Sequence, residues 1–302
     1  MARKWEGRSK TTVLGYKIIL GCIRYLGVGT AYFVLRFVAF WFLLFSREGT
    51  KASYYYFKNR WGYSSLRSLL KCYRHNYIFG QILIDKMAIA SGLRERYTYE
   101  FDGIERIKAM LAEKRGGILL SAHVGNFEVA DFFFRDIDLN AQINIVVLDN
   151  EHRGIKEYLE SVMGKTNLRS ILVKEDMSHI FEIHQALDRN ELICLSGDRY
   201  LEGTKTTEAE LLGATAKFPA GVFAVAARLN VPVLFVYVMK ETARHYHLYA
   251  RTAEVKRRDT QGLLQQYTQS IESVLHRYPY QWFNFFDFWD EYDSKNESGK
   301  NP

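Results

Sequence analysis

A histidine and a glutamate stand five residues apart at the end of an apolar run, where they could carry out acid–base chemistry. Residues Gly117–Ala122 read as a buried strand, and His123 follows directly. If a helix begins just after the strand, Glu128 lies about one turn in and can reach the His123 ring. Open α/β sheets place their sites at the carboxyl ends of strands. A neutral imidazole held there by a carboxylate can take a proton from an alcohol.

A second apolar run ends in charged residues. Leu192–Leu195 predicts a strand, and Asp198 and Arg199 follow it, so they should open onto the same sheet edge as His123. An arginine there could bind a phosphate of the acceptor or the donor through two parallel hydrogen bonds. The alternative interpretation is an Asp–Arg turn that only closes the strand.

Two further segments suggest contacts with a substrate. Gly125 allows close approach to the backbone, which a bulky thioester would require, and Asn126 either orders the turn or touches substrate. Pro219 begins a predicted helix over Val222–Leu229, whose free amide groups could cradle an anion or an oxyanion. The residues of this second segment that we expect to bind substrate are Lys217, Phe218, Pro219 and Gly221.

Together these motifs resemble the lysophospholipid acyltransferase superfamily, and most closely its lipid A lauroyl/myristoyl acyltransferase branch. The matching segments are Ser121–Glu128, Ser196–Arg199, Leu212–Gly221 and Ala226–Val233. The resemblance implies a general base, His123, oriented by Glu128. It also implies transfer of an acyl group from acyl carrier protein or coenzyme A to a hydroxyl, with no cofactor. Pro219-Ala220-Gly221 replaces the Pro-Glu-Gly-Thr of the glycerophospholipid branch, which favours a lipid A-like acceptor.

Several alternatives stay open at this point. The acceptor could instead be a phosphatidylinositol mannoside, an aminolipid or a polyene pigment lipid. The protein could also be a non-catalytic module that binds lipid or carrier, or a hydrolase. A metal site is not expected, because His179 and His184 lack the i, i+4 spacing of a helical pair. His245 and His247 share a strand face but have no third ligand in view.

The composition indicates anionic partners. The 302 residues carry a net charge of +7, which suits an acidic carrier protein or an anionic membrane surface. Nucleic acid is excluded as a partner, because no zinc-ligand spacing, RNP-like motif or basic recognition helix is found. The segment Gln281–Trp289 is dense in aromatic residues, which favours a packed carboxyl-terminal cap over the border of an acyl channel or a membrane face.

The amino terminus predicts attachment to the cytoplasmic face of the inner membrane. Basic residues crowd the first 24 positions, and Arg36 is the only charge between Tyr25 and Phe45. This length just reaches the roughly 20 residues that a span requires, and the basic stripe equally suits a helix in the interface. The third interpretation of this segment is a buried helix of a soluble protein.

The pattern of strands and helices predicts an α/β fold. Its sheet is largely parallel and mixed, covered by helices on both faces, with a membrane-associated helical segment at the amino terminus. We divide the chain into a basic helix over 1–46, an aromatic-rich helical connector over 47–97, an α/β acyltransferase domain over 98–290 and a polar tail over 291–302.

Overall fold

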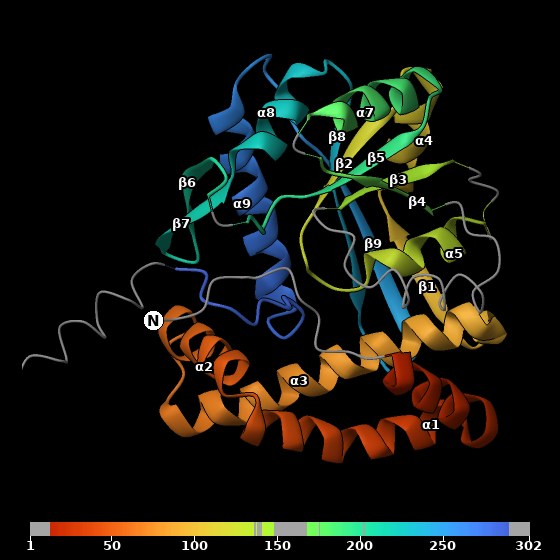
Figure 1. Ribbon diagram of the computed structural model, residues 1–302, viewed down its shortest axis with the longest axis vertical. Helices are drawn as coiled ribbons and strands as arrows, with labels where there is room; N and C mark the ends of the chain where they lie inside the picture. Colours follow the sequence, from red (N-terminus) through yellow and green to blue (C-terminus); the bar gives the residue numbers. More distant parts are fainter. Residues whose placement is uncertain are drawn as a thin grey trace, which may run out of the picture.

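A computed structural model describes residues 13–135, 137, 141–147, 168–174, 176–201 and 203–289. Its centre is a seven-stranded sheet in the order β1-β9-β8-β2-β5-β3-β4, in which only β8 and β9 pair antiparallel (Figure 1). The predicted fold class is therefore confirmed. The strands are β1 (Thr98–Asp102), β2 (Gly117–Ser121), β3 (Ile143–Val147), β4 (Leu168–Leu172), β5 (Leu192–Ser196), β8 (Val233–Lys240) and β9 (His245–Thr252).

Helices cover both faces of this sheet. The helices of the α/β part are α4 (Ile104–Ala112), α5 (Ala130–Arg135), α7 (Ser178–Asp188), α8 (Ala220–Arg228) and α9 (Thr260–Arg277). The core residues of α4 and α5 belong to one buried cluster, and those of α7, α8 and α9 to the other. The central strands β2 and β8 are buried along their whole length, because helices cover them on both sides.

Sequence patterns missed a two-stranded hairpin. Strands β6 (Thr206–Leu211) and β7 (Ala214–Pro219) pair antiparallel beside α9, so Lys217 and Phe218 lie in a strand. The tight turn uses Leu212 and Gly213, both with positive φ (52° and 71°). Helix α8 begins at Ala220, two residues before the predicted start. The predicted polar tail over 291–302 lies outside the described residues.

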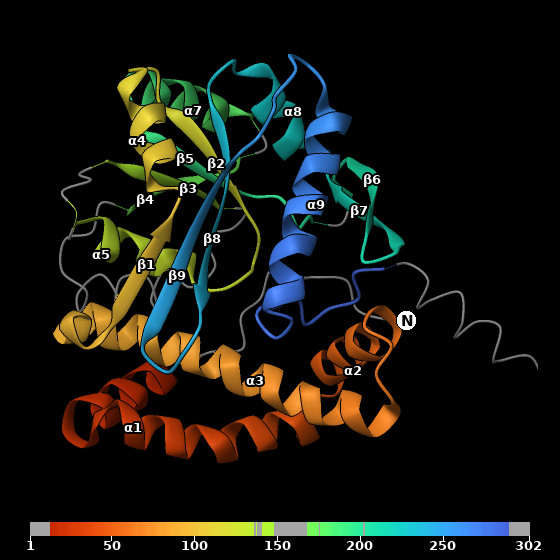
Figure 2. The same ribbon diagram turned by 180° about the vertical axis from the view of Figure 1, so that it is seen from behind.

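A helical layer covers the sheet edge at the carboxyl end of β8 (Figures 1 and 2). It consists of α1 (Val13–Phe45), α2 (Arg47–Tyr55) and α3 (Ser65–Ala88). Short turns complete the layer and its links, at Tyr56–Arg60, Ile89–Leu93 and Arg94–Arg96. Helix α1 is kinked at Gly27 and lies along α3, where Leu35 packs against Gly80. Its buried residues form one stripe: Ile23, Val28, Ala31, Leu35 and Ala39.

A buried polar network joins this layer to the sheet. The Lys240 ammonium at the end of β8 pairs with the carboxylate of Asp85 on α3, and it donates to the Tyr32 hydroxyl of α1 at 3.1 Å. Tyr97 donates to the same carboxylate at 2.9 Å, and Tyr246 bonds to it as well. Burial lowers the pKa of Lys240, and the negative charge of Asp85 opposes that shift. If α1 and α3 moved away from the sheet, Lys240 or Asp85 would be left as a buried charge without its partner, which is costly. The network therefore holds α1 and α3 against the sheet.

Candidate active site

Strand register brings His123 and Asp198 together. Strands β2 and β5 pair in parallel with Ser121 opposite Ser196. His123 and Asp198 each follow two residues later, so they leave adjacent strands at the same edge of the sheet. The predicted common edge is therefore confirmed. Tyr267 of α9 secures this edge by donating to the Ser121 carbonyl at 2.8 Å.

The Asp198 carboxylate is buried and accepts hydrogen bonds on both oxygens. His123 Nδ1 lies 2.8 Å from Oδ1, while the His123 backbone N–H donates to Oδ2 at 3.0 Å. The Trp282 indole N–H also donates to Oδ2, at 3.1 Å. Burial raises the pKa of Asp198, but the charge and hydrogen bonds of His123 outweigh it and lower the pKa to about 2. The carboxylate is therefore ionised at neutral pH and can only accept.

This carboxylate determines the tautomer of the imidazole. Because Asp198 can only accept, Nδ1 of His123 must carry the proton, and Nε2 keeps its lone pair. The His123 side chain is 35% exposed, and no described residue hydrogen-bonds to Nε2. Burial and the charge of Arg199 lower the pKa of His123, whereas the charges of Asp198 and Glu128 oppose them. The ring is thus a neutral base at neutral pH.

The structure corrects the expected position of Glu128. Gly125 has φ 66°, and the chain passes through a 3₁₀ turn over Phe127–Val129 before α5 begins at Ala130. This path turns the half-exposed Glu128 side chain toward α3, where it forms an ion pair with Lys86. The hydrogen bond at Nδ1 of His123 belongs to Asp198 instead of Glu128.

Gly125 and Asn126 attach the motif loop to the rest of the fold. A Cβ at Gly125 would collide with the Val238 carbonyl of β8, so the close approach it allows is to this strand. The Asn126 backbone N–H donates to that same carbonyl at 2.8 Å. Its buried side chain donates to the Ile82 carbonyl of α3 at 3.2 Å. Both residues hold the loop that presents His123.

Arg199 is partly buried beside the pair. Its Nη2 donates to the Phe283 carbonyl at 2.8 Å, and its guanidinium lies 5.8 Å from the Phe286 ring centroid. Burial lowers the pKa of Arg199, and the adjacent Asp198 opposes that shift. The positive charge is close enough to lower the pKa of His123. The site therefore holds a base and a cation side by side.

The predicted segment Lys217–Gly221 lies in the hairpin and the start of α8. No hydrogen bond or ion pair among the described residues joins it to His123 or Asp198. Phe218 is fully buried and packs against Tyr267 and Phe288. Pro219 caps α8, and a Cβ at Gly221 would meet open space. Phe218 is a core residue that supports Tyr267, the residue bonded to the end of β2.

Sequence reasoning missed the contribution of Gln281, Trp282 and Phe283 to the site. The Gln281 carbonyl accepts from the Gly125 N–H at 2.8 Å, and the Phe283 N–H donates to the His123 carbonyl at 2.9 Å. The aromatic rings of the segment Gln281–Trp289 pack together as expected: the ring centroids of Trp282 and Phe288 are 4.8 Å apart. The only sequence signal for the polar role is a tryptophan N–H, which needs a partner when buried.

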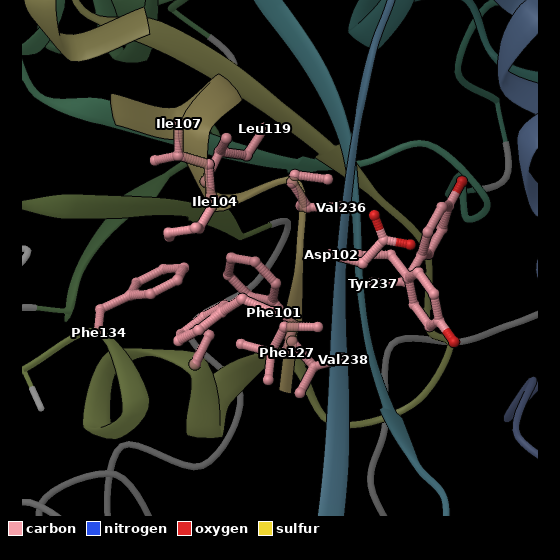
Figure 3. A pocket seen from close by; sticks show the side chains of 14 residues that line it. Phe101, Asp102, Ile104, Ile107, Leu119, Phe127, Phe134, Val236, Tyr237 and Val238 are labelled. Atoms are coloured by element: carbon pink, nitrogen blue, oxygen red, sulfur yellow. The ribbon is translucent and has the colours of Figure 1, made fainter. Parts of the chain in front are cut away.

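A small apolar cavity lies between β8 and the helices α4 and α5. Phe101, Ile104 and Phe134 line it together with Val236 and Val238, while Tyr237 points to the other side of β8 (Figure 3). His123, Asp198 and Arg199 are not among its lining residues. The cavity is therefore separate from the histidine–aspartate pair.

The fold and site define an α/β protein in which a histidine at the carboxyl end of a central strand, held by a buried carboxylate, could take a proton from a hydroxyl group. The model of one protein family, the bacterial lipid A biosynthesis acyltransferases, matches residues 72–290. This match covers more than half of the chain, so the protein belongs to that family and is an acyltransferase. The resemblance stated from sequence is confirmed. No curated protein sequence matches the chain.

Proposed function

We propose that the protein transfers a fatty acyl group from acyl carrier protein to a hydroxyl of a lipid A-like glycolipid at the cytoplasmic face of the inner membrane. The observation that carries the proposal is the hydrogen-bonded pair of His123 and Asp198, found in a chain of the lipid A acyltransferase family. In this proposal His123 is the general base. Asp198 orients it, and Glu128 contributes its negative charge from nearby.

The reaction needs no covalent enzyme intermediate. Nε2 of His123 takes the proton of the acceptor hydroxyl while its oxygen attacks the thioester carbonyl carbon. The imidazolium that forms is stabilised by the Asp198 carboxylate. The tetrahedral intermediate collapses with cleavage of the C–S bond. The thiolate then takes the proton from the imidazolium, which restores the neutral base.

Charge supports a carrier protein as the donor. The chain is +7, and acyl carrier proteins are strongly acidic, so their fields attract one another. The phosphopantetheine arm of the donor carries a phosphate, as does a lipid A precursor. Arg199 beside the base is the residue we assign to one of these phosphates.

A thioester assay with purified protein tests the proposal. With acyl carrier protein as donor, we expect release of free thiol only when a lipid A precursor is present, with one new acyl chain on the glycolipid by mass spectrometry. Free fatty acid released without acceptor would identify a hydrolase. Binding of both substrates without thiol release would identify a non-catalytic module. A deletion strain with intact lipid A but a missing aminolipid, pigment lipid or mannoside would reassign the acceptor.

The helical layer supports membrane binding in the plane of the interface. Helix α1 contains one segment, Leu20–Phe45, that is long and apolar enough to cross a membrane. The same segment packs along α3 and sends Tyr32 into the buried network with Lys240. A spanning α1 would have to leave both contacts. We therefore propose that α1 lies on the membrane.

An exposed aromatic stripe gives α1 its membrane side. Phe33, Phe37, Trp41 and Phe45 follow one another at intervals of four residues and are 56%, 64%, 55% and 64% exposed. Leu66 and Leu70 of α3, also exposed, extend the apolar surface. Rings of this kind bury readily at the boundary of headgroups and acyl chains. The layer adjoins the carboxyl end of β8 (Figure 2), and its helix α3 contacts the loop after β2 through Asn126, so a lipid-borne acceptor would reach His123 from this side.

Replacing Phe37, Trp41 and Phe45 together by glutamine should move most of the protein from the membrane pellet to the soluble fraction. These side chains are exposed, so the fold should keep its melting temperature. The matched control is Phe181→Gln: this residue is 74% exposed and belongs to α7, a helix at the end of the molecule opposite α1 (Figure 1). A triple variant that stays in the pellet after a carbonate wash would favour a spanning helix.

A further inference from the structure

We propose that Trp282 is a positioning residue for the base: its indole N–H holds the Asp198 carboxylate, which holds His123. The proposal rests on the proposed function, in which His123 is the general base. Trp282 contributes a donor at 3.1 Å to Oδ2, while His123 Nδ1 bonds to the other oxygen, Oδ1. The His123 backbone N–H also donates to Oδ2, at 3.0 Å, and together these donors fix the rotation of the carboxylate and thereby the plane of the imidazole.

Backbone hydrogen bonds hold Trp282 in this place. The residues on either side of it bond to the motif loop: Gln281 accepts from the Gly125 N–H, and Phe283 donates to the His123 carbonyl. Trp282 itself forms an isolated antiparallel bridge with Val124. The segment is thus paired with the loop that carries His123, although it lies about 160 residues further along the chain. Any shift of the segment would move the indole and the base together.

His75 of α3 secures the other side of Trp282. Its Nε2 donates to the Trp282 carbonyl at 2.9 Å, and its Nδ1 lies 3.1 Å from the Ser53 hydroxyl of α2. Burial lowers the pKa of His75 to about 4, and the bond to the Trp282 carbonyl opposes that shift. The ring therefore stays neutral at the pH of the reaction. Its Nε2 proton is available to the carbonyl throughout.

The consequence for His123 follows from charge. The indole N–H stabilises the negative charge on Oδ2. Without this donor, Asp198 stabilises the protonated imidazole of His123 more strongly, which raises the pKa of His123. The ring also loses the fixed plane that aims Nε2 at the acceptor. The other titratable groups facing the pair are Arg199, Glu128 with its partner Lys86, Tyr237 and Tyr267.

The test is Trp282→Phe, which keeps a buried aromatic ring and removes only the donor. We expect kcat to fall about tenfold to a hundredfold, the scale of a hydrogen bond to a charged group, with KM changed less than about threefold. The acid limb of the pH–rate profile should shift to higher pH, by about half a pH unit or more. The matched control is Trp289→Phe, which lies in the same aromatic cluster and donates to Leu211 at 3.3 Å instead. Its acid limb should stay in place.

A second measurement keeps the inference testable if no substrate is turned over. The His123 ring signals of histidine-labelled protein can be titrated by NMR without any donor or acceptor. An upward shift in Trp282→Phe but not in Trp289→Phe would support the positioning role even if the proposed reaction fails. Equal titration curves and equal kcat in wild type and Trp282→Phe would overturn it. The inference would also be overturned if the melting temperature of Trp282→Phe fell so far that unfolding explained the whole loss of activity.

Discussion

His123→Ala should lower the rate of acyl transfer by at least about a hundredfold, because general-base catalysis contributes on that scale. The variant keeps the Asp198 carboxylate but has no imidazole nitrogen to take the acceptor proton. Wild-type activity should rise with pH to a plateau, and the midpoint of the rise should lie below the ordinary imidazole pKa near 6.5, since burial and Arg199 lower the pKa of His123. The measurement is thiol release against pH for purified wild type and variant.

The control for this experiment is His184→Ala. His184 is exposed and belongs to α7, a helix at the end of the molecule opposite the helical layer (Figure 1), so its loss should leave the rate unchanged. Circular dichroism melts of both variants separate a loss of chemistry from a loss of fold. Near-normal transfer by His123→Ala would end the assignment of this residue as the base.

Asp198→Asn should be nearly as damaging, also at least about a hundredfold. Two N–H donors point at Oδ2, so the amide oxygen of asparagine should take that position. The NH₂ group would then face Nδ1 of His123 and force that nitrogen to accept. The proton would move to Nε2, where the base is needed. The variant should fold, because its shape is unchanged, and its kcat should fall with little effect on KM.

Glu128→Gln gives the comparison that separates the two carboxylates. Glu128 is half exposed and paired with Lys86, and it acts on His123 only through space. We expect a loss of about tenfold or less, since a half-exposed charge is screened by solvent. If Glu128→Gln instead loses more activity than Asp198→Asn, Glu128 rather than Asp198 orients the base in the complex with substrate.

The sequence predicted the sheet and one edge of the site because both depend on local patterns. Apolar runs marked β2 and β5, and the residues after them fell at the same sheet edge as expected. The partner of His123 was not predictable in the same way. Glu128 is close in sequence, but a positive φ at Gly125 turns the chain aside, and the register of two distant strands supplies Asp198 instead.

Two other features differ in how far sequence could reveal them. The hairpin of β6 and β7 leaves a signal in the sequence: small or apolar residues alternate with polar ones on both sides of Leu212-Gly213. The segment around Trp282 had no such signal, because it is irregular and bonds to the site mainly through its backbone. Irregular backbone contacts of this kind leave no periodic pattern in a sequence.

The network of Tyr32, Asp85 and Lys240 sets an order of events during synthesis. Tyr32 and Lys240 are 208 positions apart, so at about 5–20 residues per second the ribosome needs roughly 10–40 s between them. Helices α1 and α3 leave the ribosome early and can pair as a hairpin, but the Asp85 carboxylate has no lysine partner from β8 until late in translation. The contact through which Asp85 joins the helical layer to the sheet can therefore form only after β8 has been synthesised.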